Sequence, residues 1–468
     1  MSNRLFKALF CMGLVLIVWF SPVPEGLKPE AWKLFAIFLG TVCGFIVQPA
    51  PMGVVAMVAV VTCSLTGTLK LGQALSGFSN STVWLVVSAF MFSRGFIKTG
   101  LGRRIAFKVM GRFGDNSLKL AYSLTAANLL LGPVIPSNTA RAGGVLFPIV
   151  QSLCVVFDSA PGKTARRMGT FLMTVVFQTD LVICAMFLTS MAANPLMAEL
   201  AFKTVGVTIT WTGWFVAAIV PGFIALVLIP CVIYKLSPPE IKKTPEAKEL
   251  AARELAEMGP MKGSEKAMTA IFLLTLTGWI IGSHVPILNG TTVALLGVSL
   301  MLATDVLVWK DALSEHNAWD NLVWMGTIVA LAGFLNSFGF IGWFAKNVSG
   351  MLVGIPWVMA VIAAGVIYLY SHYGFASMTA HVTAMYAALI AVAAGTGAPP
   401  FLAAFIVAIA ANVCGCLTHY GTGPAPIFYG AGYVSQGEWW RNGFLMSILN
   451  ILVWFGLGPV WWKILGLW

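Results

Sequence analysis

Two short polar stretches stand out because each combines hydrogen-bond donors with a basic side chain inside apolar sequence. Residues 137–141 read SNTAR, and residues 377–381 read SMTAH. Hydroxyl and amide groups donate hydrogen bonds, and the backbone N–H groups at the start of a half-helix add partial positive charge. One such cluster suits a single carboxylate. Two clusters facing each other across a small cavity predict a site for a dicarboxylate.

Two further stretches, 189–195 (TSMAANP) and 418–424 (THYGTGP), interrupt apolar sequence with similar donors. Each predicts a helix that is broken by Gly or Pro at membrane depth. As an alternative, the Ser and Thr hydroxyls bond only helix backbone, which is common in membrane helices. We predict that the substrate-binding residues are Ser137, Asn138, Thr139, Arg141, Thr189, Asn194, Ser377, Thr379, His381, Thr422 and Pro424.

Arg141 and His381 end the two stretches at equivalent positions. A charged side chain inside a membrane costs several kcal/mol, so it is a functional candidate by default. Arg stays protonated, whereas His can be neutral or charged. Fixed cations beside a dianion would replace the sodium ions of a symporter, and surplus positive charge in an empty site would favour obligate exchange. Asp180 is a candidate ion-pair partner of Arg141, with a proton-relay role as the alternative.

The composition places these stretches in a membrane protein. Of the 468 residues, 59% are hydrophobic and 10% are charged, and the mean hydropathy is +0.87. These values exclude a water-soluble enzyme. At about 20 apolar residues per crossing, the chain has room for on the order of ten membrane helices. The apolar run 5–20 is followed by SPVP rather than a small-residue cleavage site, which predicts a retained helix.

The formal charge of +11 comes from 28 Lys and Arg residues against 17 Asp and Glu residues. If the N-terminus is inside and the segments alternate, most of the basic residues fall on the cytoplasmic side, notably at 94–119, 163–167 and 235–266. This distribution follows the positive-inside rule. The charge therefore marks topology rather than nucleic-acid binding. We expect a multi-pass protein of the cell inner (plasma) membrane, with a cytoplasmic N-terminus and the C-terminus outside.

Turns and similar stretches divide the chain into two halves. The predicted parts are an N-terminal transmembrane helix (1–29), a first inverted repeat (30–235), a cytoplasmic linker (236–266) and a second inverted repeat (267–468). Each repeat contains a re-entrant hairpin, at 120–157 and at 355–396. The first arm of the first hairpin would be about 21 Å long, too short for a membrane core of about 30 Å. The predicted fold is an all-α polytopic membrane protein with about 11 transmembrane helices, two hairpins and broken helices, as in secondary transporters.

The eight cysteines and five histidines show no metal-ligand spacing. The cysteines are scattered through apolar runs and are interpreted as buried packing residues. Cys414 and Cys416 form one C-x-C pair, which alone does not specify a metal. His372 and His419 lie close to the proposed clefts and are candidates for bonding the substrate. The sequence predicts no metal site and no cofactor.

Several stretches carry a family resemblance, and they are KTGLGRRIA (98–106), IPSNTARAGG (135–144), AMFLTSMAANPL (185–196), PPEIKKTPEA (238–247), MGPMKGSE (258–265), LTHYGTGPAPIFYGAGYV (417–434) and WWKILGLW (461–468). Together they resemble the divalent anion:sodium symporter (DASS) family, in particular its exchanger branch and the chloroplast-type 2-oxoglutarate/malate translocators. The plastid members carry a transit peptide that is missing here, which suggests a bacterial plasma-membrane protein or a processed chain.

The resemblance implies a Ser-Asn-Thr signature at each hairpin tip, and the second tip departs from it at Met378. In sodium-coupled members this Asn helps to build a sodium site, so Met378 implies that sodium does not couple there. Arg141 and His381 match the exchanger pattern. The resemblance also implies an elevator mechanism, in which a transport unit (120–235 and 355–468) slides against a dimerising scaffold.

We therefore predict a secondary active antiporter that exchanges C4/C5 dicarboxylates such as 2-oxoglutarate, malate or succinate, and no enzyme activity. The partners expected are small-molecule dicarboxylates, the lipid bilayer and a second copy in a homodimer, without nucleic acid. A sodium-coupled dicarboxylate symporter is the first alternative. An intramembrane hydrolase built on Ser137, Ser377 and His381 is another, although a nucleophile elbow is missing. A passive anion channel is a further alternative, but two re-entrant tips are more typical of a transporter that works by alternating access.

Overall fold

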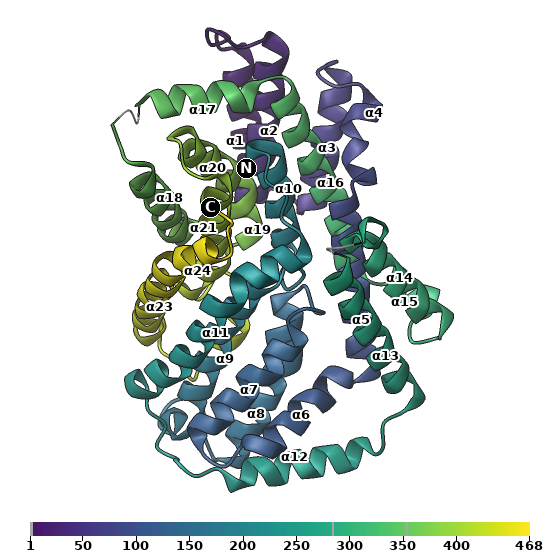
Figure 1. Cartoon of the computed structure of the whole chain (residues 1–468), viewed down its shortest axis with the longest axis vertical. Coiled ribbons are helices and arrows are strands. Elements are labelled where there is room, and N and C mark those ends of the chain that lie inside the picture. Colours follow the sequence, from purple (N-terminus) through teal and green to yellow (C-terminus); the bar gives the residue numbers. More distant parts are fainter. Residues whose placement is uncertain (1–2, 283–284, 352–353) are drawn as a thin grey trace.

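The computed structural model describes residues 3–282, 285–351 and 354–468 (Figure 1). These residues form helices joined by turns, and they contain no β-strand beyond one isolated bridge between Asn116 and Lys243. Nine helical segments of the described ranges are long and apolar enough to cross a membrane. The prediction of an all-α polytopic membrane protein is thus confirmed. His284, one of the five histidines, lies outside the described residues.

Pro, Gly and polar turns divide the N-terminal half into helices of very different lengths. In chain order they are α1 (Asn3–Phe20), α2 (Pro29–Val47), α3 (Met52–Leu65), α4 (Leu71–Ala74), α5 (Ser81–Thr99), α6 (Leu101–Phe113), α7 (Ser117–Leu131), α8 (Phe147–Val156), α9 (Gly169–Met186), α10 (Ala193–Val205), α11 (Trp211–Leu236) and α12 (Pro245–Met258). The longest, α11, continues through Pro221 and Pro230.

The C-terminal half repeats this pattern of long and interrupted helices. Its elements are α13 (Gly263–Ile281), α14 (Gly290–Ala303), α15 (Trp309–Leu313), α16 (His316–Ser337), α17 (Phe340–Met351), α18 (Trp357–Ser371), α19 (Met378–His381), α20 (Ala387–Gly395), α21 (Pro400–Val413), α22 (Ala425–Gly430), α23 (Gln436–Asn450) and α24 (Gly458–Ile464). The described part of the second half thus also alternates long spans with short helical pieces.

Both predicted hairpins are broken helices whose second arm contains a π-helical stretch. In the first hairpin, α7 stops before Gly132 and Pro133, and a π-helix (Thr139–Leu146) leads into α8. Pro lacks the N–H group that would continue the helix. In the second hairpin, a 3-10 turn (His372–Gly374) separates α18 from α19, and a π-helix (Val382–Tyr386) leads into α20. The hairpin tips 137–141 and 377–381 lie at the start of these second arms, and they are called the first tip and the second tip below.

Two further helices are interrupted where the sequence predicts it. The 187–192 loop separates α9 from α10, and the 417–424 loop follows a 3-10 turn (Cys414–Cys416) that ends α21. Every residue of α9 is buried, and α9 packs against α7, α11 and α21. Polar groups on α9 must therefore find their partners inside the protein, because an unpaired buried polar group is costly.

Two equivalent helices, one from each half, lie at opposite ends of the molecule. In Figure 1, α6 and α12 lie at the lower end and α17 lies at the upper end. The equivalent helices α6 and α17, which follow α5 and α16, are thus placed as an inverted repeat places them. The 236–266 linker folds onto the first half, because α12 packs against α6 and buried Arg104 meets Glu265 at 2.6 Å. The division into 1–29, 30–235, 236–266 and 267–468 stays a prediction.

Candidate functional site

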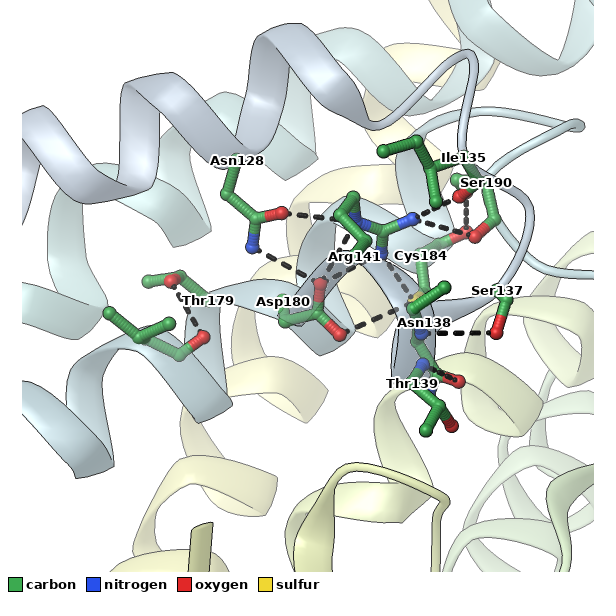
Figure 2. A network of polar contacts seen from close by, with 12 residues as sticks. Asn128, Ile135, Ser137, Asn138, Thr139, Arg141, Thr179, Asp180, Cys184 and Ser190 are labelled. Carbon is green, nitrogen blue, oxygen red and sulfur yellow. Dashed lines mark hydrogen bonds and ion pairs between the residues drawn. The ribbon is translucent and has the colours of Figure 1, made fainter. Parts of the chain in front are cut away.

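Arg141 sits at the centre of a buried polar network at the first tip (Figure 2). Its Nε donates to Asn128 Oδ1 and to Asp180 Oδ1, at 3.0 Å each. Its two terminal nitrogens donate to four acceptors, which are Asp180 Oδ1 (2.8 Å), the Ile135 carbonyl (2.7 Å), the Ser190 carbonyl (2.8 Å) and Cys184 Sγ (3.0 Å). All the guanidinium N–H groups are therefore used inside the protein.

The predicted ion pair between Arg141 and Asp180 is thus confirmed, and both side chains are fully buried. The pair joins the first tip to α9, and the two carbonyl contacts tie it to the 187–192 loop. Because Asp180 balances the charge, Arg141 is not an isolated cation in this conformation. The role of Arg141 as a direct substrate ligand stays a prediction. In this structure its hydrogen bonds hold the first tip in position against α9 and the 187–192 loop.

The first tip presents its donors at a partly exposed surface. Ser137, Asn138 and Thr139 are each half-buried. Ser137 Oγ accepts from the Ala140 N–H at 3.2 Å, and Asn138 Oδ1 accepts from the Thr139 N–H at 3.0 Å. These bonds cap the second arm of the hairpin. The Asn138 amide nitrogen donates to Thr422 Oγ1 at 2.7 Å, which links the tip to the 417–424 loop.

Thr422, Gly423 and Pro424 meet the first tip directly. A Cβ placed on Gly423 would lie 1.9 Å from Thr139 Oγ1, so the tip approaches as closely as a glycine permits. Gly423 is exposed although its neighbours Thr422 and Pro424 are buried. The loop therefore opens to solvent at the point where it touches the tip. The structure brings together Asn138, Thr139 and Thr422, as the sequence predicts for a common site.

The second tip resembles the first in its backbone and differs in its cap. Ser377 Oγ accepts from the Ala380 N–H at 3.3 Å, as Ser137 does from Ala140. Met378 has no oxygen, so the Thr379 N–H lacks the side-chain cap that Asn138 gives to Thr139. Met378 Sδ and the Thr422 methyl group both lie within 3.3 Å of the position that a Cβ on Gly415 would take. Both tips therefore converge on Thr422.

His381 is buried in a chain of hydrogen bonds behind the second tip. Its Nδ1 lies 3.0 Å from His372 Nδ1, and its Nε2 lies 3.0 Å from Ser371 Oγ. His372 Nε2 lies 2.7 Å from the Gly421 carbonyl, which can only accept, so that nitrogen carries a hydrogen. With both rings neutral, His381 Nδ1–H donates to His372 and His381 Nε2 accepts from Ser371. The ring of His381 stacks between Tyr368 and Phe375, at centroid distances of 3.9 and 4.1 Å.

Thr189 and Asn194 are buried and bonded within the protein. Thr189 Oγ1 donates to the Pro133 carbonyl at 2.6 Å and accepts from the Trp211 indole at 3.0 Å. The Asn194 amide donates to the carbonyls of Cys184 and Phe187, which end α9, and accepts from Asn412 at 2.8 Å. Both side chains hold the broken helix in shape, and their predicted contact with substrate stays a prediction.

Several residues of the network do not appear among the predicted site residues, and they are Asn128, Cys184, Ser190, Ser371 and Asn412. Asn128 and Asn412 carry amides in the last turns of the apolar helices α7 and α21, a signal that the sequence does contain. The role of Ser190 is played by its backbone carbonyl, and no pattern of side chains reveals it. His419, the other histidine near the proposed clefts, accepts from the Trp440 indole at 3.1 Å.

Comparison with known proteins places this geometry in a family. The family model described as "Sodium:sulfate symporter transmembrane region" matches residues 2–468. The chain belongs to this family. The resemblance to divalent anion:sodium symporters is therefore confirmed over the whole chain, and the chain is a multi-pass membrane transporter rather than an enzyme.

Relatives of known name cover nearly the whole chain. It is 51% identical over 466 residues to the Bacillus subtilis protein named "Putative malate transporter YflS", covering 99% of this chain and 97% of that protein. It is 47% identical over 456 residues to "Dicarboxylate transporter 1, chloroplastic" of Spinacia oleracea, covering 97% of this chain and 80% of that protein.

Solved structures share the fold at low sequence identity. The YdaH transporter of Alcanivorax borkumensis superposes with a TM-score of 0.57 at 13% identity, covering 100% of this chain and 99% of that one. MtrF of Neisseria gonorrhoeae superposes with a TM-score of 0.58 at 12% identity, covering 98% of this chain and 95% of that one. At such identities the likeness concerns the fold alone.

Proposed function

We propose that the protein is a secondary active antiporter that exchanges C4/C5 dicarboxylates, such as 2-oxoglutarate, malate or succinate, across the plasma membrane. The observation that carries this proposal is the convergence of two donor-rich tips on Thr422. The hydroxyls of Thr139 and Thr379 make no hydrogen bond within the described residues, and both threonines are partly exposed. One tip offers donors to each carboxylate of a short dianion.

The electrostatics of the tips suit a dianion. The carboxylate that contacts the first tip, Asp180, is buried and paired with Arg141. No Asp or Glu of the described chain lies within ion-pair distance of His381. A second negative charge on the substrate therefore meets helix starts and hydroxyls rather than a facing carboxylate, with the imidazoles buried behind the second tip. The two relatives whose names mention malate and dicarboxylates support the same substrate class.

Exchange rather than sodium coupling is favoured by the second tip. Met378 replaces the amide that, by the family resemblance, helps sodium-coupled members to hold sodium. A thioether is a poor ligand for a hard cation such as Na⁺, which prefers oxygen. The first tip keeps Asn138, but its amide group is engaged by Thr422 and by the Thr139 N–H. The sodium-coupled symporter is the rival that the experiment below distinguishes.

An elevator movement is part of this proposal, with 120–235 and 355–468 as the moving unit and a homodimer as the assembly. A cavity of about 240 Å³ lies between scaffold helices α2, α16 and α17 and the α10 and α20 helices of the moving unit. On the moving side, the second hairpin lines it with Thr383, Ala384, Ala387, Ala388 and Ala391, and α10 adds Leu200, Lys203 and Thr204. The row of small alanines on the second hairpin supports sliding. The dimer itself follows from the family resemblance.

Uptake of labelled malate by proteoliposomes tests the proposal. Vesicles are loaded with unlabelled dicarboxylate or left empty, and each is assayed in sodium and in sodium-free buffer. We expect uptake only into loaded vesicles, at the same rate with and without sodium. Sodium-dependent uptake into empty vesicles would replace the antiporter with the symporter, and sodium-independent uptake into empty vesicles would indicate a passive pathway.

A further inference from the structure

Three buried side chains from two separate segments of the chain meet behind the second tip. They are His372 in the 3-10 turn after α18, His381 at the end of α19, and Cys414 at the end of α21. One ligand atom from each lies within 4.8 Å of the other two. The sequence shows no metal spacing here, because the residues come from two separate segments that only the fold brings together.

We propose that His372, His381 and Cys414 form a binding site for a soft transition-metal ion, with Zn²⁺ as the best match. Imidazole nitrogen and thiolate sulfur are the ligands that zinc prefers. In a tetrahedral zinc site two nitrogen ligands lie about 3.3 Å apart. The two Nδ1 atoms lie 3.0 Å apart, so a metal needs only a small outward movement of the rings.

The surroundings of the two imidazoles match what metal-binding histidines require. Such a histidine donates its other ring N–H to a carbonyl or similar acceptor, which fixes the ring and the tautomer. His372 Nε2–H already donates to the Gly421 carbonyl at 2.7 Å. His381 Nε2 already lies 3.0 Å from Ser371 Oγ, whose own hydrogen can turn to the Tyr368 carbonyl at 2.9 Å. Both Nδ1 atoms are then free to face the ion.

The proton balance of binding is simple. In the metal-free state one hydrogen lies between the two Nδ1 atoms, on His381. When Zn²⁺ binds, this hydrogen moves to His381 Nε2 and stays on the ring. Cys414 loses its thiol proton to solvent, so one proton is released for each ion bound. The site gains one net positive charge, and its affinity for zinc rises with pH.

Two buried polar atoms beside the cluster are without partners, which marks an unsatisfied polar region. Within the described residues the Tyr368 hydroxyl and Thr418 Oγ1 have no hydrogen-bond partner, although both side chains are fully buried. Native proteins rarely leave such groups unpaired. Tyr368 stacks on the ring of His381, and a Cβ on Gly421 would lie 2.8 Å from both Thr418 Oγ1 and His372 Nε2. The described chain adds no fourth His, Cys or carboxylate ligand, so one coordination position is left for water or an anion.

The backbone beside the cluster is partly exposed in the second hairpin. Gly374 and Ala376, which connect the 3-10 turn to the second tip, are exposed, and Phe375 between them is partly exposed. A bound ion would tie the second hairpin to the end of α21. The proposal concerns ion binding by the purified chain without dicarboxylate, so its outcome is independent of the proposed exchange.

Cobalt titration of the purified, metal-stripped protein tests the site. Co²⁺ takes the place of Zn²⁺, and its bond to a thiolate gives a charge-transfer band in the near ultraviolet. We expect one equivalent of Co²⁺ to produce the band and Zn²⁺ to abolish it by displacement. We also expect Zn²⁺ to raise the thermal melting temperature of the wild-type protein, because an ion that binds only the folded state stabilises it.

The variants Cys414→Ser and His372→Gln supply the decisive comparison. Each removes one ligand atom, and Gln retains an N–H donor for the Gly421 carbonyl. We expect each to weaken binding at least about 100-fold. Cys416→Ser is the matched control, since Cys416 is equally buried on the same turn but bonds the Gly443 carbonyl. Absence of a thiolate band in the folded wild type, a band that persists in Cys414→Ser, or an equal loss in Cys416→Ser would each overturn the proposal.

Discussion

The first and second tips place residues at equivalent positions around their basic side chains. The two tips differ in whether a carboxylate balances the basic side chain. The equivalent pairs, each 240 residues apart, are Asn128 and Tyr368, Ile135 and Phe375, and Arg141 and His381. At the first tip, amide, carbonyl and thiol acceptors surround a guanidinium. At the second tip, aromatic rings enclose an imidazole, with a second imidazole at its edge.

The decisive difference is Asp180, which has no counterpart at the second tip. The ion pair with Asp180 makes the first tip neutral overall and uses every Arg141 donor. The second tip has only neutral partners among the described residues, and its two imidazoles are fully buried, which favours their neutral form. The first tip is thus neutral because two opposite charges are paired. The second tip is neutral because the described residues place no carboxylate or fixed cation there.

Removing Asp180 is expected to have the largest effect. Asp180→Asn leaves Arg141 buried without a counter-charge, which costs roughly 3–5 kcal/mol. We expect a marked fall in the melting temperature of the purified protein, measured by size-exclusion chromatography after heating. The double variant Arg141→Met/Asp180→Leu removes both charges and is expected to recover much of the loss. Equal melting temperatures for the single and double variants would show that the charge balance is not what stabilises this tip.

The contact between the first tip and the 417–424 loop comes next. A Cβ on Gly423 would lie 1.9 Å from Thr139 Oγ1, so Gly423→Ala must displace the Thr139 side chain at the first tip. We expect malate exchange to fall at least about tenfold in protein that still folds, since misplacing a binding group by about 1 Å is costly. Gly144→Ala, in the same hairpin but with open space at its Cβ, is the control. Normal exchange by Gly423→Ala would remove this junction from the site.

The sequence predicts the tips better than it predicts the roles of their side chains. Gly132, Pro133 and the paired 137–141 and 377–381 stretches specify where the helices break, because local backbone chemistry decides this. The Arg141 and Asp180 pair was also predictable, since two isolated charges in apolar sequence must find each other. By contrast, the contacts of Thr189 and Asn194 with broken helix ends depend on how α9 and α10 pack. Whether a hydroxyl faces substrate or backbone is decided by that packing.

The pH response tests whether the second tip takes up a proton. His372 and His381 are fully buried, and burial disfavours the charged form of an imidazole. We therefore expect both rings to stay neutral between pH 8 and pH 5.5. After correction for the protonation of malate itself, the KM for malate exchange should not depend on pH in the wild type or in His381→Gln. A KM that falls several-fold in the wild type but not in His381→Gln would show that the histidine pair titrates.

The substitution with the smallest expected effect on KM supplies the side-chain cap that the second tip lacks. Met378→Asn supplies a side-chain oxygen for the Thr379 N–H, as Asn138 Oδ1 does for Thr139 at 3.0 Å, and so removes one donor from the substrate. A hydrogen bond of about 1 kcal/mol predicts a KM raised roughly threefold to tenfold, with little change in kcat. Met378→Leu keeps the size without the acceptor and should leave KM unchanged. If both variants raise KM equally, packing rather than the free Thr379 N–H is responsible. If Met378→Asn makes uptake sodium-dependent, the missing amide alone separates exchange from sodium coupling.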